Sequence, residues 1–393
     1  MSGITAMGTT YNLPNYTGLL YGLSPTETPF FSAIGGLNGG AQTSSTEFEW
    51  GYYDLRAPGQ NVQLEGATAP TAQNRVRSNG TNVTQIHQEK VSVSYSKQGA
   101  SGMLSGTNVT GAAASVANEL DWQTEQMLVQ MVRDVEYSFM LGVYNKPSDN
   151  TTKRQTRGLL TAISTNKVDN STSTVTGLSA SGDTITETAT ALSNGDKIIF
   201  TDTGASTAIS TGRTYFVVSK GTNSFKVALT SGGTAITIGT ATVSYRKPYT
   251  TALTPDTLTA SLQSIYDNGG MRGGELTLLV NSAQKIAISK GYASAYGKFT
   301  ETSRTVGGVG VDSIVTDFGT LNIMLSRFVP QDTIAAVALS ECRPVYLEVP
   351  GKGHFFAEPL AKTGASDEVQ LYGEVGLAYG NERDHGLITG LAI

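Results

Sequence analysis

The most regular hydrophobic pattern in the chain lies between residues 110 and 145. Apolar residues recur there at spacings of three and four, which is the period of one face of a helix. These positions are Val116, Leu120, Met127, Met131, Val135 and Phe139. The pattern predicts a helix of about thirty residues and roughly 45 Å, well beyond the roughly 11–12 residues of an average helix. We expect it to act as a spine along which other elements pack.

Residues 46–95 alternate between apolar and polar positions, as strands with one buried face do. Phe48 and Trp50 share one face of the outgoing segment, and Val91 and Val93 share one face of the return segment. Between them lies "VQLEGATAPTAQNRVRSNGTNV", residues 62–83, with little to bury. The pattern predicts a long β-hairpin with a polar tip, and polar excursions of this length usually have a function.

Residues 165–250 differ in composition from the chain on either side, because Ser and Thr dominate them. Short apolar runs recur between turn signals such as Asn194-Gly195-Asp196 and Gly232-Gly233. The predicted strands are 197–201, 214–219, 224–229, 235–238 and 242–245. We interpret this region as a small all-β module of about 80 residues, within the usual size range of a domain, inserted into α/β material.

Residues 251–393 return to a mixed α/β pattern. Thr254 followed by Pro255 predicts the start of a helix, and Gly269-Gly270 predicts its end. A second helix is expected from Ser282 to about residue 290. The predicted strands are 276–280, 321–325, 333–339, 345–349, 370–379 and 387–391.

Residues 1–45 are predicted to form an extended arm, since Pro25 and Pro29 interrupt regular structure and glycines follow. Phe30, Phe31 and Ile34 give the arm a short apolar patch that must dock on another surface. Arm, hairpin and long helix each bury too little within one chain. Neighbouring copies would supply the missing contacts, as they do in obligate oligomers.

The chain has 393 residues, which suggests two or three structural units. Its net charge is −5, and no strongly basic tail or stripe is present, so a dedicated nucleic-acid-binding protein is not favoured. An acidic protein can still enclose nucleic acid without adhering to it. The single cysteine, Cys342, lies in an apolar run and is predicted to be a small buried hydrophobe. No signal peptide or run of about 18 apolar residues is present.

No pattern of catalytic or metal-binding residues stands out. His87, His354 and His385 have no His or Cys partner at metal-ligand spacing, and we expect surface or hydrogen-bonding roles for them. The glycines of residues 305–313 do not complete a dinucleotide-binding fingerprint. The charged turns at 366–368 and 381–386 are better explained by turn or interface contacts than by ion binding. The sequence therefore predicts no enzyme, no cofactor and no metal site, and no feature nominates the carboxylate pair of a carbohydrate-active enzyme.

Several segments together carry a family resemblance. They are "SPTETPFFSAIGG" (24–36), "TEFEWGYYDLRAPGQNVQLEGA" (46–67), "NVTQIHQEKVSVS" (82–94), "RQTRGLLTAI" (154–163), "TDFGTLNIMLSRFVPQDTIAAV" (316–337) and "EPLAKTGASDEVQLYGEVGLAYGNERDHGLITGL" (358–391). They cover most of the chain outside residues 165–250, in family order. With them the chain resembles the major capsid proteins of tailed bacteriophages, which have the Hong Kong 97-type fold.

The resemblance implies an α+β fold with an N-arm, an extended β-hairpin loop, a long spine helix and an axial α/β domain. The implied regions are an N-terminal arm at 1–45, an extended loop at 46–95, a peripheral domain at 96–164 with its spine helix at about 110–145, an inserted all-β domain at 165–250, and an axial domain with returning peripheral-domain strands at 251–393. The insertion departs from the minimal family pattern, and we expect it on the outer surface of a shell.

The resemblance also implies a function and partners. The chain would self-assemble as hexamers and pentamers into an icosahedral shell that encloses double-stranded DNA, after synthesis in the cytoplasm of a host bacterium. Expected partners are copies of itself, a portal protein and a scaffold or decoration protein, with no sequence-specific DNA binding and no membrane. A tail-tube or decoration protein is the alternative. The candidate intersubunit contacts are Phe30, Phe31, Trp50, Arg56, Glu65, Arg75, Arg77, Arg154, Arg157, Glu382 and Arg383.

Overall fold

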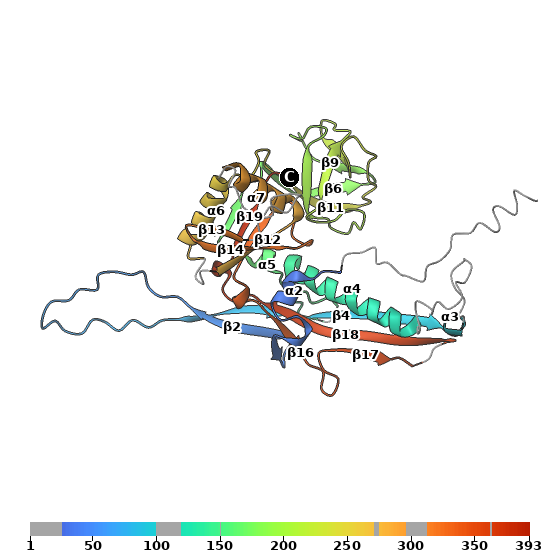
Figure 1. Ribbon diagram of the computed structural model, residues 1–393, viewed down its shortest axis with the longest axis horizontal. Helices are drawn as coiled ribbons and strands as arrows, with labels where there is room; N and C mark the ends of the chain where they lie inside the picture. The colour runs from blue at the N-terminus through green and yellow to red at the C-terminus, as the bar shows by residue number, and fades with distance from the viewer. Residues whose placement is uncertain (1–25, 100–118, 150, 271–274, 296–312, 362–363) are drawn as a thin grey trace, which may run out of the picture.

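The computed structural model describes residues 26–99, 119–149, 151–270, 275–295, 313–361 and 364–393. In this part of the chain, a five-stranded sheet, a six-stranded sheet and a closed barrel form the body. A two-stranded hairpin projects from that body (Figure 1). The molecule is therefore elongated, with the hairpin at one end.

The five-stranded sheet is built on the long strand β18 (Ser366–Ala378). One edge of β18 pairs antiparallel with β4 (Gln85–Ser94). Its other edge pairs first with β17 (Phe355–Pro359) and then with β16 (Arg343–Leu347), both antiparallel. Strand β1 (Ala41–Thr43) adds to β16 in parallel. A strand of 13 residues thus holds together segments from both ends of the chain.

The predicted spine is helix α4 (Glu119–Leu141), which lies along this sheet (Figure 1). Its predicted apolar stripe is confirmed in the second half of the helix, where Met131, Val135 and Phe139 are buried, whereas Leu120 and Met127 are only half-buried. Residues 110–118 lie outside the described part of the chain. The helix ends at Leu141, earlier than predicted. The carbonyl oxygen of Gly142 instead accepts from the N–H of Gly158 across 2.9 Å, next to α5.

The short helices α2 (Pro29–Ala33) and α5 (Leu159–Ala162) complete the core around α4. The ring of Phe31 meets that of Phe139 edge-on, with centroids 5.7 Å apart. Residues of β18 and of the six-stranded sheet, such as Leu377 and Leu279, belong to the same buried cluster. One hydrophobic core therefore joins the two sheets.

The six-stranded sheet has the order β13, β14, β12, β15, β19, β5. The strands are β13 (Ser313–Thr316), β14 (Gly319–Leu325), β12 (Glu275–Val280), β15 (Ile334–Val337), β19 (Gly386–Thr389) and β5 (Lys167–Asp169). Helices α6 (Pro255–Asp267) and α7 (Ser282–Ala295) pack against it. The predicted start of α6 is confirmed, because Thr254 forms a capping box with Thr257 and Pro255 occupies the first turn.

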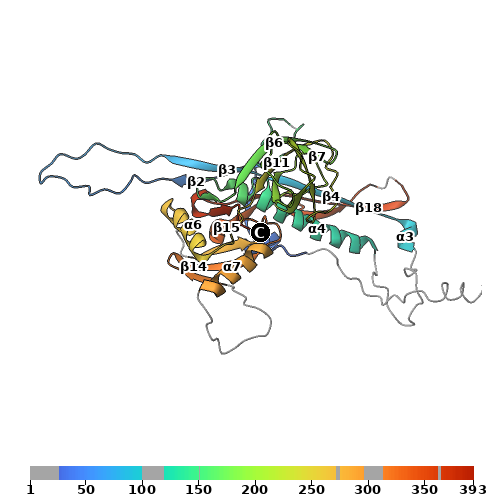
Figure 2. The same cartoon turned by 90° about the horizontal axis from the view of Figure 1, so that it is seen from above.

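The barrel closes in the order β10, β7, β6, β11, β8, β9. Its strands are β6 (Ser173–Ser181), β7 (Thr184–Thr186), β8 (Lys197–Asp202), β9 (Thr214–Val218), β10 (Ser224–Ala228) and β11 (Ala241–Lys247). Phe200, Tyr215, Phe225 and Tyr245 fill it as edge-on aromatic pairs. The view from above shows the barrel and helices α6 and α7 on different sides of the body (Figure 2). The predicted strand at 235–238 is absent, and β6 and β7 were not predicted.

The chain enters the barrel and leaves it through two neighbouring segments, one at Asn170 and one at Tyr249. On the way in, the backbone N–H of Asn170 donates to the carbonyl oxygen of Thr389 across 2.8 Å. On the way out, the N–H of Tyr249 donates to the carbonyl oxygen of Gly390, also across 2.8 Å. Entry and exit are therefore held at adjacent positions, at the end of β19.

The hairpin consists of β2 (Glu47–Tyr53) and β3 (Arg77–Val83), in register from Glu47 opposite Val83 to Tyr53 opposite Arg77. The prediction treated residues 83–95 as one return strand of this hairpin, which is wrong. At Thr84 the chain leaves β2, and β4 pairs with β18 instead. Thr84 fixes this change of partner, because its N–H donates to Thr46 while its hydroxyl donates to Glu374.

The remaining short elements are α3 (Tyr95–Gly99), η1 (Gly36–Asn38), η2 (Leu339–Glu341) and η3 (Glu382–Asp384). Cys342 follows η2 and is buried, as predicted. Burial raises the pKa of its thiol. Among the helices that the structure describes, none has the length and apolar character needed to span a bilayer.

Candidate assembly site: the projecting hairpin and its anchor

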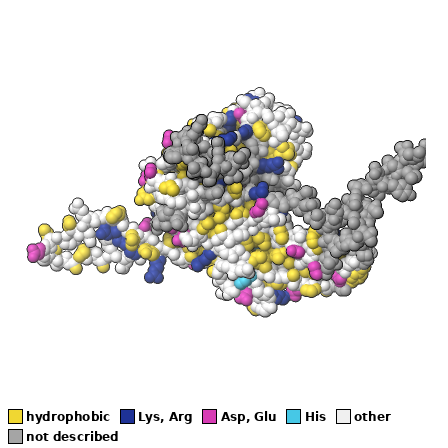
Figure 3. Space-filling model, in the orientation of Figure 1, with side chains coloured by type: hydrophobic (Ala, Val, Ile, Leu, Met, Phe, Trp, Pro, Cys, Tyr) yellow, Lys and Arg dark blue, Asp and Glu magenta, His cyan; other side chains and the backbone are white. Residues whose placement is uncertain are grey.

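The loop at the end of the hairpin, residues 54–76, is exposed along its entire length. It is less polar than the sequence suggested. Leu55, Val62, Leu64 and Val76 expose 69%, 75%, 85% and 83% of their surface. Figure 3 shows hydrophobic side chains spread along the projection among basic and acidic ones. Single exposed apolar side chains are common on protein surfaces, so it is the position of these four on one projection that makes it a candidate contact surface.

Trp50 anchors the base of the hairpin to the body. Its indole lies over Gly80 of the partner strand, where an added Cβ would approach the ring to 2.6 Å. The indole Nε1 donates a hydrogen bond of 2.6 Å to the carbonyl oxygen of Gly380. Its ring also meets that of Tyr379 edge-on, with centroids 4.9 Å apart. Trp50, predicted as an intersubunit contact, is thus half-buried within its own chain.

Asn82 fixes the other strand of the hairpin. It is fully buried, and its amide oxygen accepts from the N–H groups of Val83 and Arg157, each across 2.9 Å. Its amide nitrogen donates to the carbonyl oxygens of Leu377 and Arg157, across 2.7 and 3.2 Å. All polar positions of the side chain face backbone groups, so β3 has a defined direction where it leaves the body.

Phe30 and Phe31 are covered by their own chain and expose only 0% and 2% of their surface. Their predicted role as contacts with a neighbour is therefore corrected: within the described part of the arm, α2 docks on α4 of the same chain. Glu136 of α4 accepts the N–H of Phe30 at 3.1 Å and that of Phe31 at 2.6 Å. The burial of Glu136 raises its pKa to about 7, against the opposing effect of these two bonds.

Arg154 and Arg157 lie next to the hairpin base and have partners within the chain. Arg154 pairs with Glu374 across 3.1 Å, and the same carboxylate oxygen accepts from Thr84. The guanidinium of Arg157 lies 4.4 Å from the centre of the Tyr144 ring and donates to the hydroxyl of Tyr379. Both arginines thus support the hairpin from the body.

Glu382 and Arg383 lie in η3, away from the hairpin loop. The Glu382 carboxylate accepts from the backbone and hydroxyl groups of Ser164 and Thr165. Although partial burial acts to raise it, these bonds hold the pKa of Glu382 below its ordinary value. Arg383 is exposed, and its carbonyl oxygen accepts from Asn166.

The remaining predicted contacts, Arg56, Glu65, Arg75 and Arg77, are all exposed on the hairpin. Arg56 donates to the neighbouring carbonyl oxygen of Ala57. Within the described residues, none of the four forms an ion pair. As intersubunit contacts these four stay a prediction, whereas Arg154 and Arg157 have partners within the chain. The sequence analysis did not single out Asn82 and Gly80, whose roles depend on contacts with distant segments.

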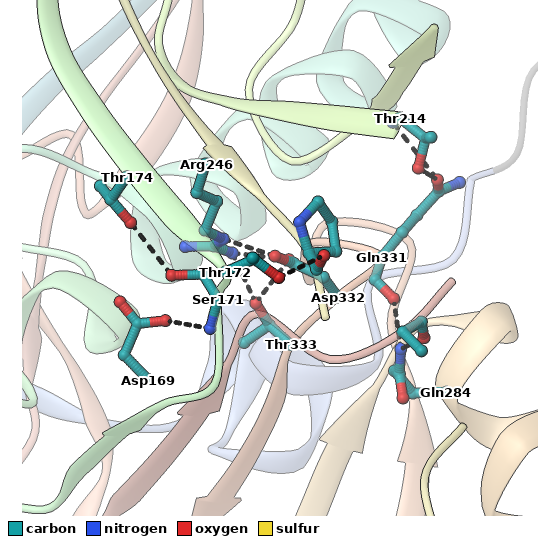
Figure 4. A network of polar contacts seen from close by, with 12 residues as sticks. Asp169, Ser171, Thr172, Thr174, Thr214, Arg246, Gln284, Gln331, Asp332 and Thr333 are labelled. Carbon is teal, nitrogen blue, oxygen red and sulfur yellow. Dashed lines mark hydrogen bonds and ion pairs between the residues drawn. The ribbon is translucent and has the colours of Figure 1, made fainter. Parts of the chain in front are cut away.

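A second polar cluster fixes the barrel to the six-stranded sheet (Figure 4). The Arg246 guanidinium forms a bidentate ion pair with the carboxylate of Asp332, which is fully buried. Gln331 accepts from the N–H and hydroxyl of Thr214. The backbone oxygen of Gln331 accepts in turn from Gln284 of α7, across 2.9 Å. These contacts attach the barrel to the six-stranded sheet and to α7.

The three histidines do not form a site. His87 is buried, its Nε2 has no hydrogen-bond partner among the described residues, and burial lowers its pKa to about 4. His385 is buried between the N–H of Ala338 and the carbonyl oxygen of Tyr379. His354 contacts Gln42 and stacks on Tyr346. In the part of the chain that the structure describes, no three His, Cys, Asp or Glu side chains gather as metal ligands would.

A projecting hairpin, a long helix along a sheet and a second α/β layer together define a shell-building capsid protein of the Hong Kong 97-like fold. The fold is similar to the cyanophage A-1(L) capsid subunit, with a TM-score of 0.54, 10% identity and 99% of each chain covered. It is also similar to a subunit from the capsid of a native GTA particle, with a TM-score of 0.51, 12% identity and coverage of 100% and 99%. For the capsid of cyanophage P-SCSP1u the TM-score is 0.50, at 9% identity and coverage of 97% and 93%.

The chain belongs to the SU10 major capsid protein family, whose sequence profile matches residues 3–392. No curated protein matches it significantly. It is a major capsid protein that forms a phage-type shell, and it resides in the capsid of the virion. Its role is structural and not enzymatic.

Proposed function

We propose that the chain assembles as hexamers and pentamers of an icosahedral shell around double-stranded DNA, and that each hairpin lies across the adjacent subunit. The observation that carries this proposal is the exposed loop at residues 54–76, with its four aliphatic side chains. Covering such a side chain contributes roughly 1.5–3 kcal/mol. In a free subunit these side chains stay exposed and the loop gains none of this free energy. The loop is therefore stabilised only in an assembly.

The proposed division of the chain follows from the sequence resemblance. Residues 1–45 act as the N-arm, 46–83 as the extended loop, 84–164 as the peripheral domain, which now includes β4, and 251–393 as the axial domain with returning strands. The barrel within residues 165–250 lies on the outer surface. The net charge of −5 supports a shell that encloses DNA without adhering to it. A portal protein and a scaffold or decoration protein complete the proposed partners.

Removal of the loop tests this proposal. A variant lacking residues 57–73 keeps β2, β3 and the Trp50 anchor, so we expect a folded, soluble subunit that forms no closed shells in negative-stain micrographs. A matched control is Leu229→Ser, which removes a half-exposed aliphatic side chain from the barrel and should leave shells intact. Normal shells from the loop deletion would contradict the bridging role.

A further inference from the structure

One loop of the barrel contacts both layers of the body, the five-stranded sheet with α4 and the six-stranded sheet with α6 and α7 (Figure 1). The hydroxyl of Thr211, between β8 and β9, lies 3.2 Å from the hydroxyl of Tyr137 on α4. The carbonyl oxygen of the next residue, Gly212, accepts from the N–H of Gln331 across 3.1 Å. Gln331 lies between β14 and β15 of the six-stranded sheet. Residues 211–212 therefore bridge the two layers.

This loop is fixed to the barrel to which it belongs. The N–H of Ser210 donates to the hydroxyl of Tyr215 across 2.9 Å, and the N–H of Gly212 donates to the carbonyl oxygen of Phe200 across 3.1 Å. The side chain of Ile209 is buried in the barrel core, together with those of Tyr215 and Phe200. The position of the loop is therefore set by the strands of the barrel.

The barrel is attached in turn to the six-stranded sheet. The ion pair of Arg246 with Asp332 forms one attachment. The loop forms another, because a Cβ at Gly212 would lie 3.2 Å from three carbon atoms of Pro330. Gly212 also has a left-handed backbone, with φ of 75°, which favours glycine. The barrel therefore meets the six-stranded sheet at two places and reaches α4 through Thr211.

The contact on α4 lies outside the hydrophobic core that joins the two sheets. Tyr137 is 45% exposed, whereas its neighbours Glu136 and Ser138 are buried. Its ring meets that of Phe328 edge-on, with centroids 6.1 Å apart. Hydrophobic packing is non-directional, so a core alone leaves two layers free to tilt by small amounts. A directional contact outside that core opposes such a tilt.

We propose that the barrel is a brace: its loop at residues 209–212 holds α4 at a fixed angle to the six-stranded sheet. Identical subunits form regular contacts in a closed shell only when each presents its contact surfaces within a narrow range of relative orientations. A brace within the subunit narrows that range. It acts inside one chain, independently of the contact that the hairpin makes with a neighbour.

The angle between the layers can be measured in unassembled subunits. Nitroxide labels at Gln126→Cys of α4 and Lys290→Cys of α7, both exposed positions, report the distance between the layers by double electron–electron resonance. The native Cys342 is buried. When the brace is broken, we expect a distance distribution about twofold broader, because the layers gain a hinge motion.

The substitution Gly212→Val tests the barrel side of the brace. The new side chain would meet Pro330, so the loop should move away and the distribution should broaden. Gly232→Val is the matched control, because Gly232 also lies in the barrel and has a similar φ of 70°, but a Cβ there meets nothing within 4 Å. The control shares the backbone strain without the clash and should leave the distribution unchanged. Equal broadening in both variants would overturn the brace.

The substitution Tyr137→Ala tests the α4 side without altering the barrel, and we expect the same broadening. Tyr266→Ala on α6 is the control: Tyr266 is 54% exposed, and its ring likewise meets one phenylalanine, Phe318, at a centroid distance of 5.4 Å. Adding Gly212→Val to Tyr137→Ala should broaden the distribution no further, since both changes open the same bridge, whereas independent effects add. Unchanged widths in both single variants, or additive widths in the double variant, would show that the barrel is no brace.

Discussion

The indole nitrogen of Trp50 and the carbonyl oxygen of Gly380 form a hydrogen bond of 2.6 Å that joins the hairpin to the segment after β18. This bond and the edge-on contact with Tyr379 link β2 to the body, as do buried Phe48 and the ion pair of Glu47 with Lys146. The contribution of Trp50 to this attachment can be tested.

Replacement of Trp50 by Ala should loosen the hairpin. We expect the free energy of unfolding of the unassembled subunit to fall by about 2–3 kcal/mol, less than the roughly 3–5 kcal/mol of a fully buried Trp. Urea denaturation measures this loss, and hydrogen exchange of β2 and β3 should become faster. Tyr53→Ala is the control, because Tyr53 is 69% exposed on the same strand. Equal effects of both changes would contradict the anchoring role.

Gly80 should tolerate no side chain while Trp50 keeps its position. A Cβ at Gly80 would come within 2.6 Å of the indole, whereas one at Gly51 would meet nothing within 4 Å. Gly80→Ala should therefore cost about 1–3 kcal/mol, as overpacking does. Gly51→Ala should change stability by no more than about 0.5 kcal/mol. The comparison uses the same substitution in two paired strands, and loss of stability at Gly51 instead would refute it.

Glu136 should make stability depend on pH. Its pKa in the folded chain, about 7, lies above the ordinary value of 4.5. The folded state therefore binds the proton of Glu136 more tightly than the unfolded state does, so protonation of this residue stabilises the fold. This stabilisation is greatest below pH 4.5 and is lost as the pH rises toward 7. At about 1.4 kcal/mol per pKa unit, the loss is about 3 kcal/mol.

The variant Glu136→Gln isolates this effect. His87, with its pKa lowered to about 4, contributes in the opposite sense, because its stabilising effect appears as the pH rises from 4 to 6.5. Asp134, with a raised pKa, adds a smaller contribution of the same sign as that of Glu136. The difference between wild-type and variant curves from pH 4.5 to 8 should show the slope of Glu136 alone. Parallel curves would show that Glu136 does not titrate in this range.

The attachment of the barrel to the six-stranded sheet should depend on Arg246. Replacing it with Met leaves the fully buried carboxylate of Asp332 without its cation, which typically costs about 3–5 kcal/mol. Lys226→Met is the control, because its pair with Asp183 is about one-third exposed and contributes roughly 0–1 kcal/mol. Thermal unfolding and limited proteolysis between residues 248 and 254 would report the difference. An Arg246 variant as stable as the Lys226 variant would show that packing alone attaches the barrel to the six-stranded sheet.

Capping residues and hydrophobic spacing predicted the elements whose sequence signals lie within the element itself. The start of α6 follows from Thr254 and Pro255, and the buried face of α4 follows from its spacing. The change of partner at Thr84 could not be predicted, because no turn residue separates β3 from β4 in the sequence and the contacts of Thr84 are made with the distant Thr46 and Glu374. Phe30 and Phe31 were assigned to an intersubunit surface, since nothing in the nearby sequence indicates that Glu136 receives them.

The adjacent crossings at Asn170 and Tyr249 make the insertion interchangeable. Because the chain leaves and returns at neighbouring residues of β19, the six-stranded sheet needs nothing from the barrel to complete its own strands. Any domain with closely spaced termini meets the same geometric requirement. A domain exchanged at this position would also have to supply a cation for Asp332, because the buried carboxylate of that residue pairs with Arg246 of the barrel.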